Sequence, residues 1–581
     1  MEDDSINIKR PQRWDVPFWS EGVDEAALEM TTEDVTRLMQ IPLLSQMDES
    51  RFPESTSLRD ILLNDARLRK FKKGNIVVRQ GDYGNSAFII LSGTLRVVLD
   101  TLDPSVMGRQ EPEQKSFFDA LAQLWRNPSQ PEVRNLSRKN LREPGKTDFV
   151  TREETAIFVQ DVSAIIRDKR TAELRAGELF GEIAALSRTP RTTTVVADSE
   201  TELLEIRWQG LREIRLRSPE FRDYVDKLYR ERSLKTHLRE TTMFKHLDDA
   251  TLDKVAAATE FLTFGNFDWY GAYTKLREIT AAERIQREPV VAHEGHYANG
   301  VYLIRSGFAR LSETYNHGER TVSYLGRGQT FGFEEVSANW RDHTQTPFQR
   351  SLRALGYVDV LFVPTQILEQ YVLPNLPAFQ KTPEPLKKEH PLKPPVVSGS
   401  RKVSPEMMEF LVDHRFINGT ATMMIDMDRC TRCDDCVRAC ASTHNNNPRF
   451  VRHGPVSGGF MIANSCMHCQ DPVCMIGCPT GAIHRDSAHG RVVINDSTCI
   501  GCATCANSCP YDNIQMVFAR ETNGGLYYDK ATNQPIQKAA KCDLCATQIT
   551  GPACANACPH DAMIRVDMRD VDTLAEWLGK K

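Results

Sequence analysis

Residues 180–196 read FGEIAALSRTPRTTTVV, in which Glu182 stands nine residues before Arg191. A turn of small residues separates the two side chains. A fixed guanidinium fork, together with backbone N–H groups, suits a phosphate monoanion, and a carboxylate can accept a hydrogen bond from a sugar hydroxyl. The stretch therefore predicts a cradle for a small phosphate ester. The alternative is a Glu–Arg pair that only stabilises the fold.

The sequence before this cradle predicts short antiparallel strands. In residues 71–99, FKKGNIVVRQGDYGNSAFIILSGTLRVVL, apolar and polar residues alternate around Gly81, Gly84 and Gly93. This is the pattern of strands joined by glycine turns. Residues 101–165 interrupt the pattern with a charged, proline-containing segment. We interpret that segment as an insertion in a β-roll, placed where it could cover the cradle.

A similar layout recurs after residues 220–244, whose helical spacing predicts a helix that closes the first roll. The stretch VVAHEGHYANGVYLIRSGFARLSE carries three glycines spaced much like those of the first copy, and LGRGQTFGFEEV follows it. A repeat of this length indicates a duplicated domain rather than a solenoid. In the second copy Phe333 takes the place of Glu182, and Arg350 or Arg353 is the candidate for binding the phosphate.

All sixteen cysteines lie beyond residue 429, in four groups with none left over. The groups are Cys430, Cys433, Cys436 and Cys440; Cys466, Cys469, Cys474 and Cys478; Cys499, Cys502, Cys505 and Cys509; and Cys542, Cys545, Cys554 and Cys558. The first and third groups have the spacing C-x2-C-x2-C-x3-C, and the last three groups end in Cys-Pro. Three thiolates within seven residues and a more distant fourth fit an iron–sulfur cube, with the fourth thiolate pointing towards a neighbouring cluster.

Structural zinc is the alternative for these groups. The fourth group, taken alone, would pass as a zinc knuckle, because its two cysteine pairs are separated as zinc ligands usually are. The tight first and third groups favour [4Fe–4S] clusters, and four such clusters use all sixteen thiolates. His444 and His468 lie near the cysteines and are interpreted as surface histidines or as hydrogen-bond partners of the ligands, not as ligands.

Composition limits the remaining possibilities. The chain has 581 residues, 40% of them hydrophobic and 26% charged, with a formal charge of -5, so no global excess of positive charge predicts a nucleic-acid binder. The sequence has no long apolar run of the kind that spans a membrane, and its start has no apolar signal core. Clustered, reduced thiols agree with this pattern, so we expect a cytoplasmic protein with no direct membrane span.

Residues of about 420 to 565 resemble the four-cluster ferredoxin subunits of molybdopterin oxidoreductases and hydrogenases. The resemblance is carried by SCMHCQDPVCMIGCPTGAI and KCDLCATQITGPACANACPHDAM. It implies that each group lends its last cysteine to the cluster of another group, the first exchanging with the fourth and the second with the third. Carried over, the four ligand sets are Cys430, Cys433, Cys436 and Cys558; Cys542, Cys545, Cys554 and Cys440; Cys466, Cys469, Cys474 and Cys509; and Cys499, Cys502, Cys505 and Cys478.

The departures from that family are small. Ala441 replaces a proline after the first group, and the loop between Cys545 and Cys554 is short. Neither change removes a ligand, so we expect four [4Fe–4S] centres and no three-iron cluster.

The part of the chain from Phe71 to Trp208 resembles a cyclic-nucleotide-binding domain, the β-roll of catabolite activators and of the regulatory subunits of cyclic-nucleotide-dependent kinases. The resemblance is carried by FGEIAALSRTPRTTTVV. It implies that Gly181 and Glu182 bind the ribose 2′-OH, that Arg191 binds the cyclic phosphate and that Thr192 adds a hydroxyl. The implied ligand is cyclic AMP or cyclic GMP.

These patterns predict a multidomain protein with two cyclic-nucleotide-binding-like β-rolls, flanking helices and an α+β ferredoxin-like domain. The predicted boundaries are an extension at 1–56, a first roll at 57–240, a degenerate second roll at 241–371, a Pro-rich linker at 372–415 and the cysteine region at 416–581.

The predicted function is electron transfer within a hetero-oligomer. Four clusters would relay electrons for a catalytic subunit, a hydrogenase, a molybdopterin oxidoreductase or a flavin oxidoreductase, and the rolls would regulate or dock that partner. One alternative is a redox- or nucleotide-responsive regulator, but the second roll stands where catabolite activators carry their helix-turn-helix. Another is a stand-alone enzyme, but the sequence shows neither a dinucleotide fingerprint nor a catalytic triad, so no catalytic residue is assigned.

Overall fold

The computed structural model describes residues 30–100, 130–134, 169–187, 189–265, 279–316, 318–376, 403–486, 489–496, 498–528, 533–546, 548, 550–568 and 570–578. Three predicted segments lie wholly or partly outside these residues. They are the extension before Met30, the insertion at 101–165 except for residues 130–134, and linker residues 377–402.

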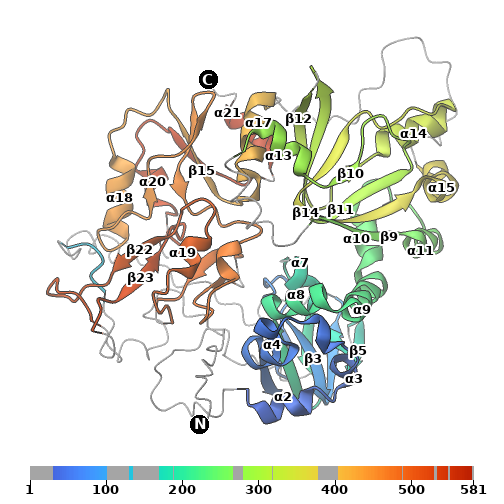
Figure 1. Cartoon of the computed structure of the whole chain (residues 1–581), viewed down its shortest axis with the longest axis horizontal. Helices are drawn as coiled ribbons and strands as arrows, with labels where there is room; N and C mark the ends of the chain where they lie inside the picture. Colours follow the sequence, from blue (N-terminus) through green and yellow to red (C-terminus); the bar gives the residue numbers. More distant parts are fainter. Residues whose placement is uncertain are drawn as a thin grey trace, which may run out of the picture. The chain divides into compact units, whose positions relative to one another are not determined.

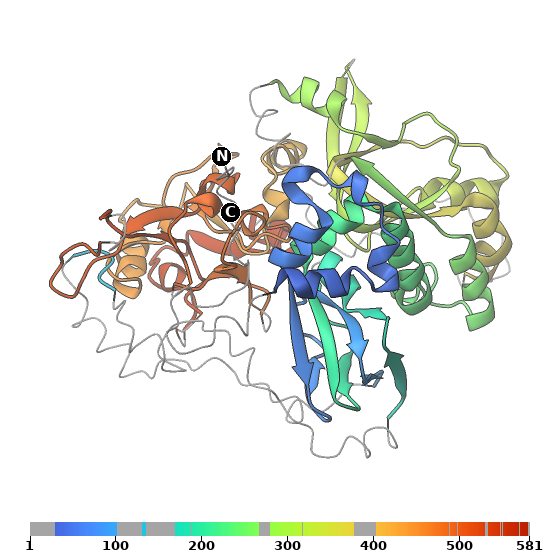
Figure 2. The ribbon, with the colours of Figure 1, turned by 60° about the horizontal axis from the view of Figure 1, so that its bottom comes forward.

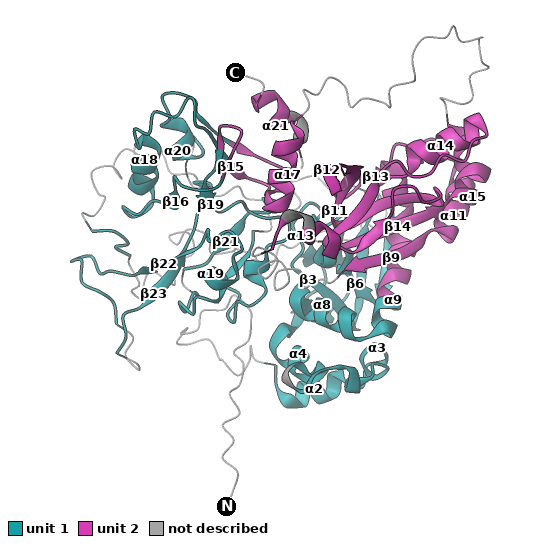
Figure 3. Cartoon of the chain, turned by 45° about the horizontal axis from the view of Figure 1, so that its top comes forward, with its two compact units in different colours: residues 1–223, 423–455, 461–564 teal, residues 224–422, 456–460, 565–581 magenta. Residues whose placement is uncertain are grey.

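The chain divides into two compact units (Figure 3). Unit 1 comprises Met1–Asp223, Met423–Pro455 and Met461–Ile564, and unit 2 comprises Tyr224–Thr422, Val456–Phe460 and Arg565–Lys581. In the described part of the chain, no helix has the length and apolar character needed to cross a bilayer.

The first roll, in unit 1, is drawn in blue to teal in Figures 1 and 2. It has two antiparallel sheets with strand orders β1-β8-β3-β6 and β2-β7-β4-β5. Its strands are β1 (Ala66–Phe71), β2 (Ile76–Val78), β3 (Ser86–Ser92), β4 (Thr94–Val98), β5 (Thr171–Arg175), β6 (Leu179–Phe180), β7 (Thr194–Ala197) and β8 (Thr201–Arg207). Inward side chains of both sheets, among them Phe88, Leu95, Val195 and Leu203, form one apolar core. The strands predicted from residues 71–99 are present, but residues 86–90 of β3 are all buried and do not alternate between a buried and an exposed face.

Short helices flank this roll. They are α2 (Thr32–Leu38), α3 (Pro42–Ser45), η1 (Glu49–Arg51), η2 (Glu54–Thr56), α4 (Leu58–Asp65), α7 (Glu182–Ser187) and α8 (Trp208–Arg217). Helices α2 and α4 begin with capping boxes at Thr31 and Ser57. The side chain of the cap accepts from the backbone N–H of Asp34 or Asp60, and the aspartate side chain accepts from the backbone N–H of the cap. The closing helix predicted for residues 220–244 consists of α9 (Pro219–Tyr229), the π-helical turn η4 (Arg230–Leu234) and α10 (Lys235–Glu240).

The second roll, in unit 2, has the strand order β10-β14-β11-β12, with β13 on β11 and β9 on β14. Its strands are β9 (Glu260–Gly265), β10 (Val290–Ala292), β11 (Gly300–Tyr315), β12 (Gly318–Leu325), β13 (Thr330–Phe331) and β14 (Ser351–Pro364). The register of β11 against β14 shifts beside Gly307, where φ is +82° and a Cβ would lie 2.4 Å from the carbonyl oxygen of Tyr357. Only glycine fits that bend in the two long strands.

The other elements of unit 2 are helical. They are α11 (Asp249–Ala258), α13 (Ala281–Arg287), α14 (Phe333–Asp342), α15 (Thr365–Ile367), η5 (Leu368–Val372), η6 (Leu373–Asn375), α17 (Pro405–Asp413), η7 (Phe416–Asn418) and α21 (Val571–Leu578).

The cysteine region is built from short elements. A four-stranded sheet has the order β17-β18-β15-β24, and the pairs β16–β19, β20–β21 and β22–β23 form two-stranded ribbons. The strands are β15 (Thr422–Asp426), β16 (Phe450–Val451), β17 (Val456–Ser457), β18 (Phe460–Ile462), β19 (Asn464–Ser465), β20 (Ile483–Arg485), β21 (Val492–Ile494), β22 (Gln515–Phe518), β23 (Gln537–Ala540) and β24 (Met563–Val566). The helices are α18 (Asp435–Thr443), η8 (Val473–Met475), α19 (Thr504–Ser508) and α20 (Ala553–Asn556).

Candidate metal centres and nucleotide site

Left-handed backbone turns shape the cysteine loops. Asp434 (φ +64°), His468 (φ +50°), Ala503 (φ +60°) and Leu544 (φ +60°) each stand between two cysteines of one group. A positive φ is uncommon outside glycine and makes the chain turn sharply. Each turn curls its loop, so that neighbouring cysteines face a common centre instead of alternating along a strand.

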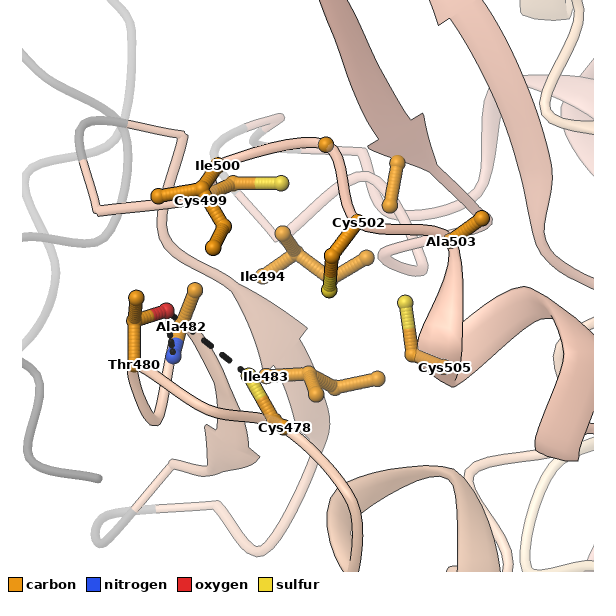
Figure 4. A pocket seen from close by; sticks show the side chains of 12 residues that line it. Cys478, Thr480, Ala482, Ile483, Ile494, Cys499, Ile500, Cys502, Ala503 and Cys505 are labelled. Carbon is orange, nitrogen blue, oxygen red and sulfur yellow. Dashed lines mark hydrogen bonds between the residues drawn. The ribbon is translucent and has the colours of Figure 1, made fainter. Parts of the chain in front are cut away.

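Three hollows of the cysteine region are each lined by four cysteines. The sets are Cys430, Cys433, Cys436 and Cys558; Cys466, Cys469, Cys474 and Cys509; and Cys499, Cys502, Cys505 and Cys478. We name them the Cys433, Cys469 and Cys502 quartets. Figure 4 shows the sulfur atoms of the Cys502 quartet directed into one space. In each quartet, three thiols come from one group and the fourth is the last cysteine of another.

The remaining four cysteines, Cys440, Cys542, Cys545 and Cys554, form the Cys545 quartet. They are all buried. Burial, and then the nearby Cys542, Cys554 and Cys545 thiols, raise the pKa of Cys440 well above its ordinary value. Every cysteine of the predicted ligand list thus stands in one of four quartets, and helix α18 carries thiols of two of them, Cys436 and Cys440.

The spacing of the sulfur atoms bears on the choice between zinc and a cluster. Thiolates that bind one tetrahedral zinc ion at about 2.3 Å lie about 3.8 Å from one another. Among the described residues, no three cysteine sulfurs lie within 4.8 Å of one another, whereas the ligand atoms of His444, Asp543 and Cys545 do. The sulfur atoms of the quartets therefore lie farther apart than those of a formed zinc site, and three of the quartets surround a hollow, as an iron–sulfur cube needs.

Hydrogen bonds stabilise the thiolate form of the cysteines, whereas burial favours the neutral thiol. Backbone N–H groups donate to Sγ of Cys440 (from Arg449, 3.2 Å) and of Cys558 (from Ala562, 3.3 Å). Such bonds stabilise thiolate ligands and raise the potential of a bound cluster. Burial raises the pKa of the Cys436 thiol to about 11 and of the Cys505 thiol to about 12, so cluster assembly at neutral pH releases their protons.

Buried cations beside the quartets are residues that sequence reasoning missed. Lys538 donates through Nζ to the carbonyl oxygen of Cys499 (2.5 Å), Lys541 to that of Cys542 (2.9 Å), and Arg485 through Nη2 to that of Cys469 (2.7 Å). Their positive charges offset the negative charge of four thiolates and their cluster. The one sequence signal for them was Lys541, directly before Cys542. A lysine next to a cysteine is common in proteins that bind no cluster.

The cradle of the first roll brings three of its four predicted residues together. Glu182, 1% exposed, begins α7 directly after Gly181, and the Arg191 guanidinium donates to the carbonyl oxygens of Gly181 and Ser86, each at 2.6 Å. Gly181 has φ +78°, which L side chains rarely adopt, and a Cβ there would also lie 2.6 Å from Arg191 Nη1. The fourth predicted residue, Thr192, is exposed. A phosphate would have to replace the carbonyl oxygens as the acceptor of the Arg191 donors.

The second roll has a phenylalanine at the position of Arg191. In the first roll the N–H of Gly81 donates to the carbonyl oxygen of Arg191 (2.7 Å), and in the second the N–H of Gly295 donates to that of Phe348 (2.8 Å). The carbonyl of the residue after each glycine accepts from the N–H of Arg191 or Phe348 in turn, at 2.7 and 2.9 Å. The two backbones therefore match, and the side chain differs.

Phe348 fills this place with an aromatic cluster. Its ring centroid lies 4.9 Å from that of Phe331 and 6.3 Å from that of Tyr302. Neither Arg350 nor Arg353, the two arginines considered for a phosphate, takes the position of Arg191. Arg350 is exposed, and Arg353 Nε donates to Glu319 at 2.9 Å, because the longer segment after α14 moves both arginines onto or before β14.

Within unit 1, the segment whose Ser86 carbonyl oxygen accepts from Arg191 also contacts a cysteine loop. Asn85, next to Ser86, donates through Nδ2 to the carbonyl oxygen of Arg485 (2.9 Å), and the Arg485 guanidinium lies 5.7 Å from the ring centre of Tyr83. Arg485 in turn donates to the carbonyl oxygen of Cys469. Three side chains thus connect the cradle to the Cys469 quartet.

Comparison with known proteins agrees with both halves. A model of the 4Fe-4S dicluster domain matches residues 458–568, and a model of the cyclic nucleotide-binding domain matches residues 161–218 and 282–375. The electron transport protein HydN of Escherichia coli (strain K12) is 35% identical over 168 residues, which is 26% of this chain and 91% of the relative. The chain belongs to the HydN-like family of iron–sulfur electron-transport proteins.

Two further similarities were found. An iron–sulfur protein of Rhodospirillum rubrum is 35% identical over 158 residues, covering 24% of this chain and 79% of the relative. The solved regulatory domain of Toxoplasma gondii PKA with cAMP is 15% identical, covers 60% of this chain and 94% of that one, and has a TM-score of 0.19. The predicted fold class, two cyclic-nucleotide-binding domains and a ferredoxin-like iron–sulfur domain, is confirmed, and the protein is an electron-transfer iron–sulfur protein.

Proposed function

We propose that the chain is an electron-transfer subunit that carries four [4Fe–4S] clusters, one in each cysteine quartet. The observation that carries the proposal is the grouping of the sixteen thiols into four quartets, three of them around a hollow and the fourth wholly buried. When bound, the clusters accept and release single electrons. The protein supplies the thiolates, excludes water and sets the charge around each centre through N–H donors and buried lysines.

The order of the quartets follows from shared elements and charges. Helix α18 links the Cys433 and Cys545 quartets, and Lys541, beside Cys542, donates to the carbonyl oxygen of Val492, which lines the hollow of the Cys469 quartet. Cys474 belongs to the Cys469 quartet and Cys478 to the Cys502 quartet, so the short segment between them connects these two quartets. The proposed row is therefore Cys433, Cys545, Cys469 and Cys502.

Both ends of this row reach the surface. Cys433 and Cys502 are the exposed cysteines, and each belongs to an end quartet. Electrons enter at one end and leave at the other, with no bond chemistry by side chains. The proposed partner is a catalytic redox subunit in a hetero-oligomer, a hydrogenase, a molybdopterin oxidoreductase or a flavin oxidoreductase, with a cytoplasmic location.

Metal analysis tests the cluster assignment. Protein purified without oxygen should contain iron and acid-labile sulfide at about sixteen atoms each per chain, and should show reduced-cluster signals in electron paramagnetic resonance. Zinc in place of iron, or iron sufficient for two clusters only, would contradict it.

We further propose that the first roll binds a cyclic nucleotide, through Gly181, Glu182 and Arg191, and that binding alters the Cys469 quartet. The support is the chain of contacts from Arg191 through Ser86 and Asn85 to Arg485. Release of the Ser86 carbonyl by Arg191 would change the loop that holds Arg485. The second roll is assigned no nucleotide, because Phe348 offers no donor to a phosphate.

Calorimetry with cyclic AMP and cyclic GMP tests this second proposal. Wild type should bind one nucleotide per chain, and Arg191→Ala should lose at least tenfold in affinity, because the charged donor is removed. Arg353→Ala, which removes a similarly buried arginine from the second roll, is the matched control and should bind like wild type. Absence of binding heat with wild-type protein would rule the site out.

A further inference from the structure

The described part of the insertion, residues 130–134, is hydrogen-bonded along the cysteine region within unit 1 (Figure 1, cyan). Val133 forms a parallel bridge with Arg520. The N–H of Arg134 donates to the carbonyl oxygen of Arg520 (2.9 Å), and the N–H of Arg520 donates to that of Glu132 (3.0 Å). The N–H of Glu132 donates to the carbonyl oxygen of Asn445 (2.8 Å). These residues, which we call the strap, pair as an added strand does.

The side chain of Glu132 is the centre of a buried charge network. It is 3% exposed and accepts from Arg449 Nη1 (2.6 Å), Asn447 Nδ2 (2.7 Å) and Arg134 Nη2 (2.6 Å), while Arg134 also binds Asp496. Burial disfavours the carboxylate, but the guanidinium groups of Arg449 and Arg134 outweigh it and hold the pKa of Glu132 below its ordinary value. Glu132 is therefore an anion at neutral pH.

The network touches loops that carry proposed ligands of two clusters. Arg449, which binds Glu132 through its side chain, donates its backbone N–H to Cys440 Sγ at 3.2 Å. Asp496 stands three residues before Cys499, whose thiol acts on the charge of Arg134. The strap thus meets the Cys545 quartet through Arg449 and the Cys502 quartet through Asp496.

We propose that Glu132 is a positioning residue for electron transfer, which fixes Arg449 beside Cys440 and balances its positive charge there. The inference goes beyond the proposed function, because it gives the insertion a role, and it rests on the cluster assignment. Loss of the Glu132 charge leaves the Arg449 guanidinium buried and uncompensated. A positive charge near a cluster favours the reduced form, which carries one more electron, so the potential of the neighbouring cluster rises.

A strap that only anchors the insertion would change stability and leave the potentials unchanged. Glu132→Gln separates these two cases, because it keeps the shape and removes the charge. Glu205→Gln is the matched control. Glu205 is also buried (6% exposed) and also binds two arginines, Arg67 (2.8 Å) and Arg69 (3.3 Å), but these lie in the sheet of the first roll.

The experiment uses the full-length, cluster-loaded protein and two measurements. Redox titration followed by electron paramagnetic resonance should show one cluster potential shifted upwards in Glu132→Gln and none shifted in Glu205→Gln. Hydrogen exchange of wild type should show protected amides at Glu132 and Arg134, and this measurement needs no variant. Iron content is measured on every sample, so that a failed cluster assignment is recognised separately from a failed strap.

Two results would overturn the inference. Amides of residues 132 and 134 that exchange in wild type as fast as an unstructured peptide would show that the strap does not form. Unchanged potentials in a Glu132→Gln protein with full iron content would show that Glu132 has no influence on a cluster.

Discussion

Arg191 and Phe348 show how one residue changes a duplicated site. The two rolls keep the same backbone hydrogen bonds around this position, and Gly181 (φ +78°) and Gly332 (φ +90°) keep the same left-handed turn before the helix. In the first roll a guanidinium occupies the position and in the second an aromatic ring. The fold accommodates either side chain because backbone hydrogen bonds, and not the side chain, close the turn.

A buried histidine in unit 2 gives a prediction at the same scale. His237, on α10, is 8% exposed, and its Nδ1 shares a hydrogen bond with the hydroxyl of Tyr229. Burial, and then the charges of Arg327 and Arg305, lower the pKa of His237 to about 4. The unfolded chain takes up the proton near pH 6.5 and the folded chain does not. Stability is therefore complete above that pH and falls by up to about 3 kcal/mol as pH drops to about 4.

Hydrogen exchange of peptides from the second roll, measured between pH 7 and pH 4 and corrected for intrinsic rates, checks this expectation. His237→Gln should remove the part of the pH dependence that comes from His237, whereas His246→Gln, at an exposed position, should follow wild type. Equal slopes in wild type and His237→Gln would contradict the prediction.

At the scale of elements, the four cysteines of one sequence group line more than one hollow. In each of the three hollows, one loop supplies three thiols and the last cysteine of another group supplies the fourth. Groups that are continuous in the sequence are therefore not the units that would bind metal.

Serine substitutions at two cysteines of one group test this exchange. Cys478→Ser should perturb the cluster of the Cys502 quartet, whereas Cys474→Ser, four residues earlier, should perturb that of the Cys469 quartet. Each change should alter or remove one cluster signal in electron paramagnetic resonance, with iron falling from about sixteen towards about twelve atoms per chain. Loss of the same signal in both variants would disprove the exchange.

Over the whole molecule, the rolls and the cysteine region depend on different sources of stability. The first roll has an apolar core that closes between two sheets, and β11 and β14 give the second roll long, buried strands. The cysteine region has short helices and two-stranded ribbons, and buried thiols form much of its interior. A bound cluster would therefore contribute directly to the folding free energy of that region.

Removal of the clusters should unfold the two parts unequally. After oxidation and chelation, proteases should cut within residues 423–564, and the rolls should remain resistant with their β-sheet circular dichroism intact. Limited proteolysis with mass spectrometry, compared before and after chelation, measures this. Uniform cleavage of the rolls and the cysteine region would contradict it.

The sequence by itself determined the fold class and the chemistry of the cysteine region. Alternation around glycines predicted the rolls, and sixteen cysteines at tight spacing predicted iron–sulfur clusters, because local patterns report which faces are buried and which ligands are near in the chain. These conclusions are confirmed by the comparisons. The exact domain boundaries and the individual ligands stay predictions.

Only the tertiary structure decided which side chains meet across long stretches of sequence. Phe348 takes the place of Arg191 although the loop before it is longer, Lys538 reaches the carbonyl of Cys499, and Glu132 of the insertion binds Arg449 beside Cys440. No periodic pattern in the sequence predicts any of these contacts. They depend on how distant loops pack, and packing brings together residues whose separation in the sequence carries no signal.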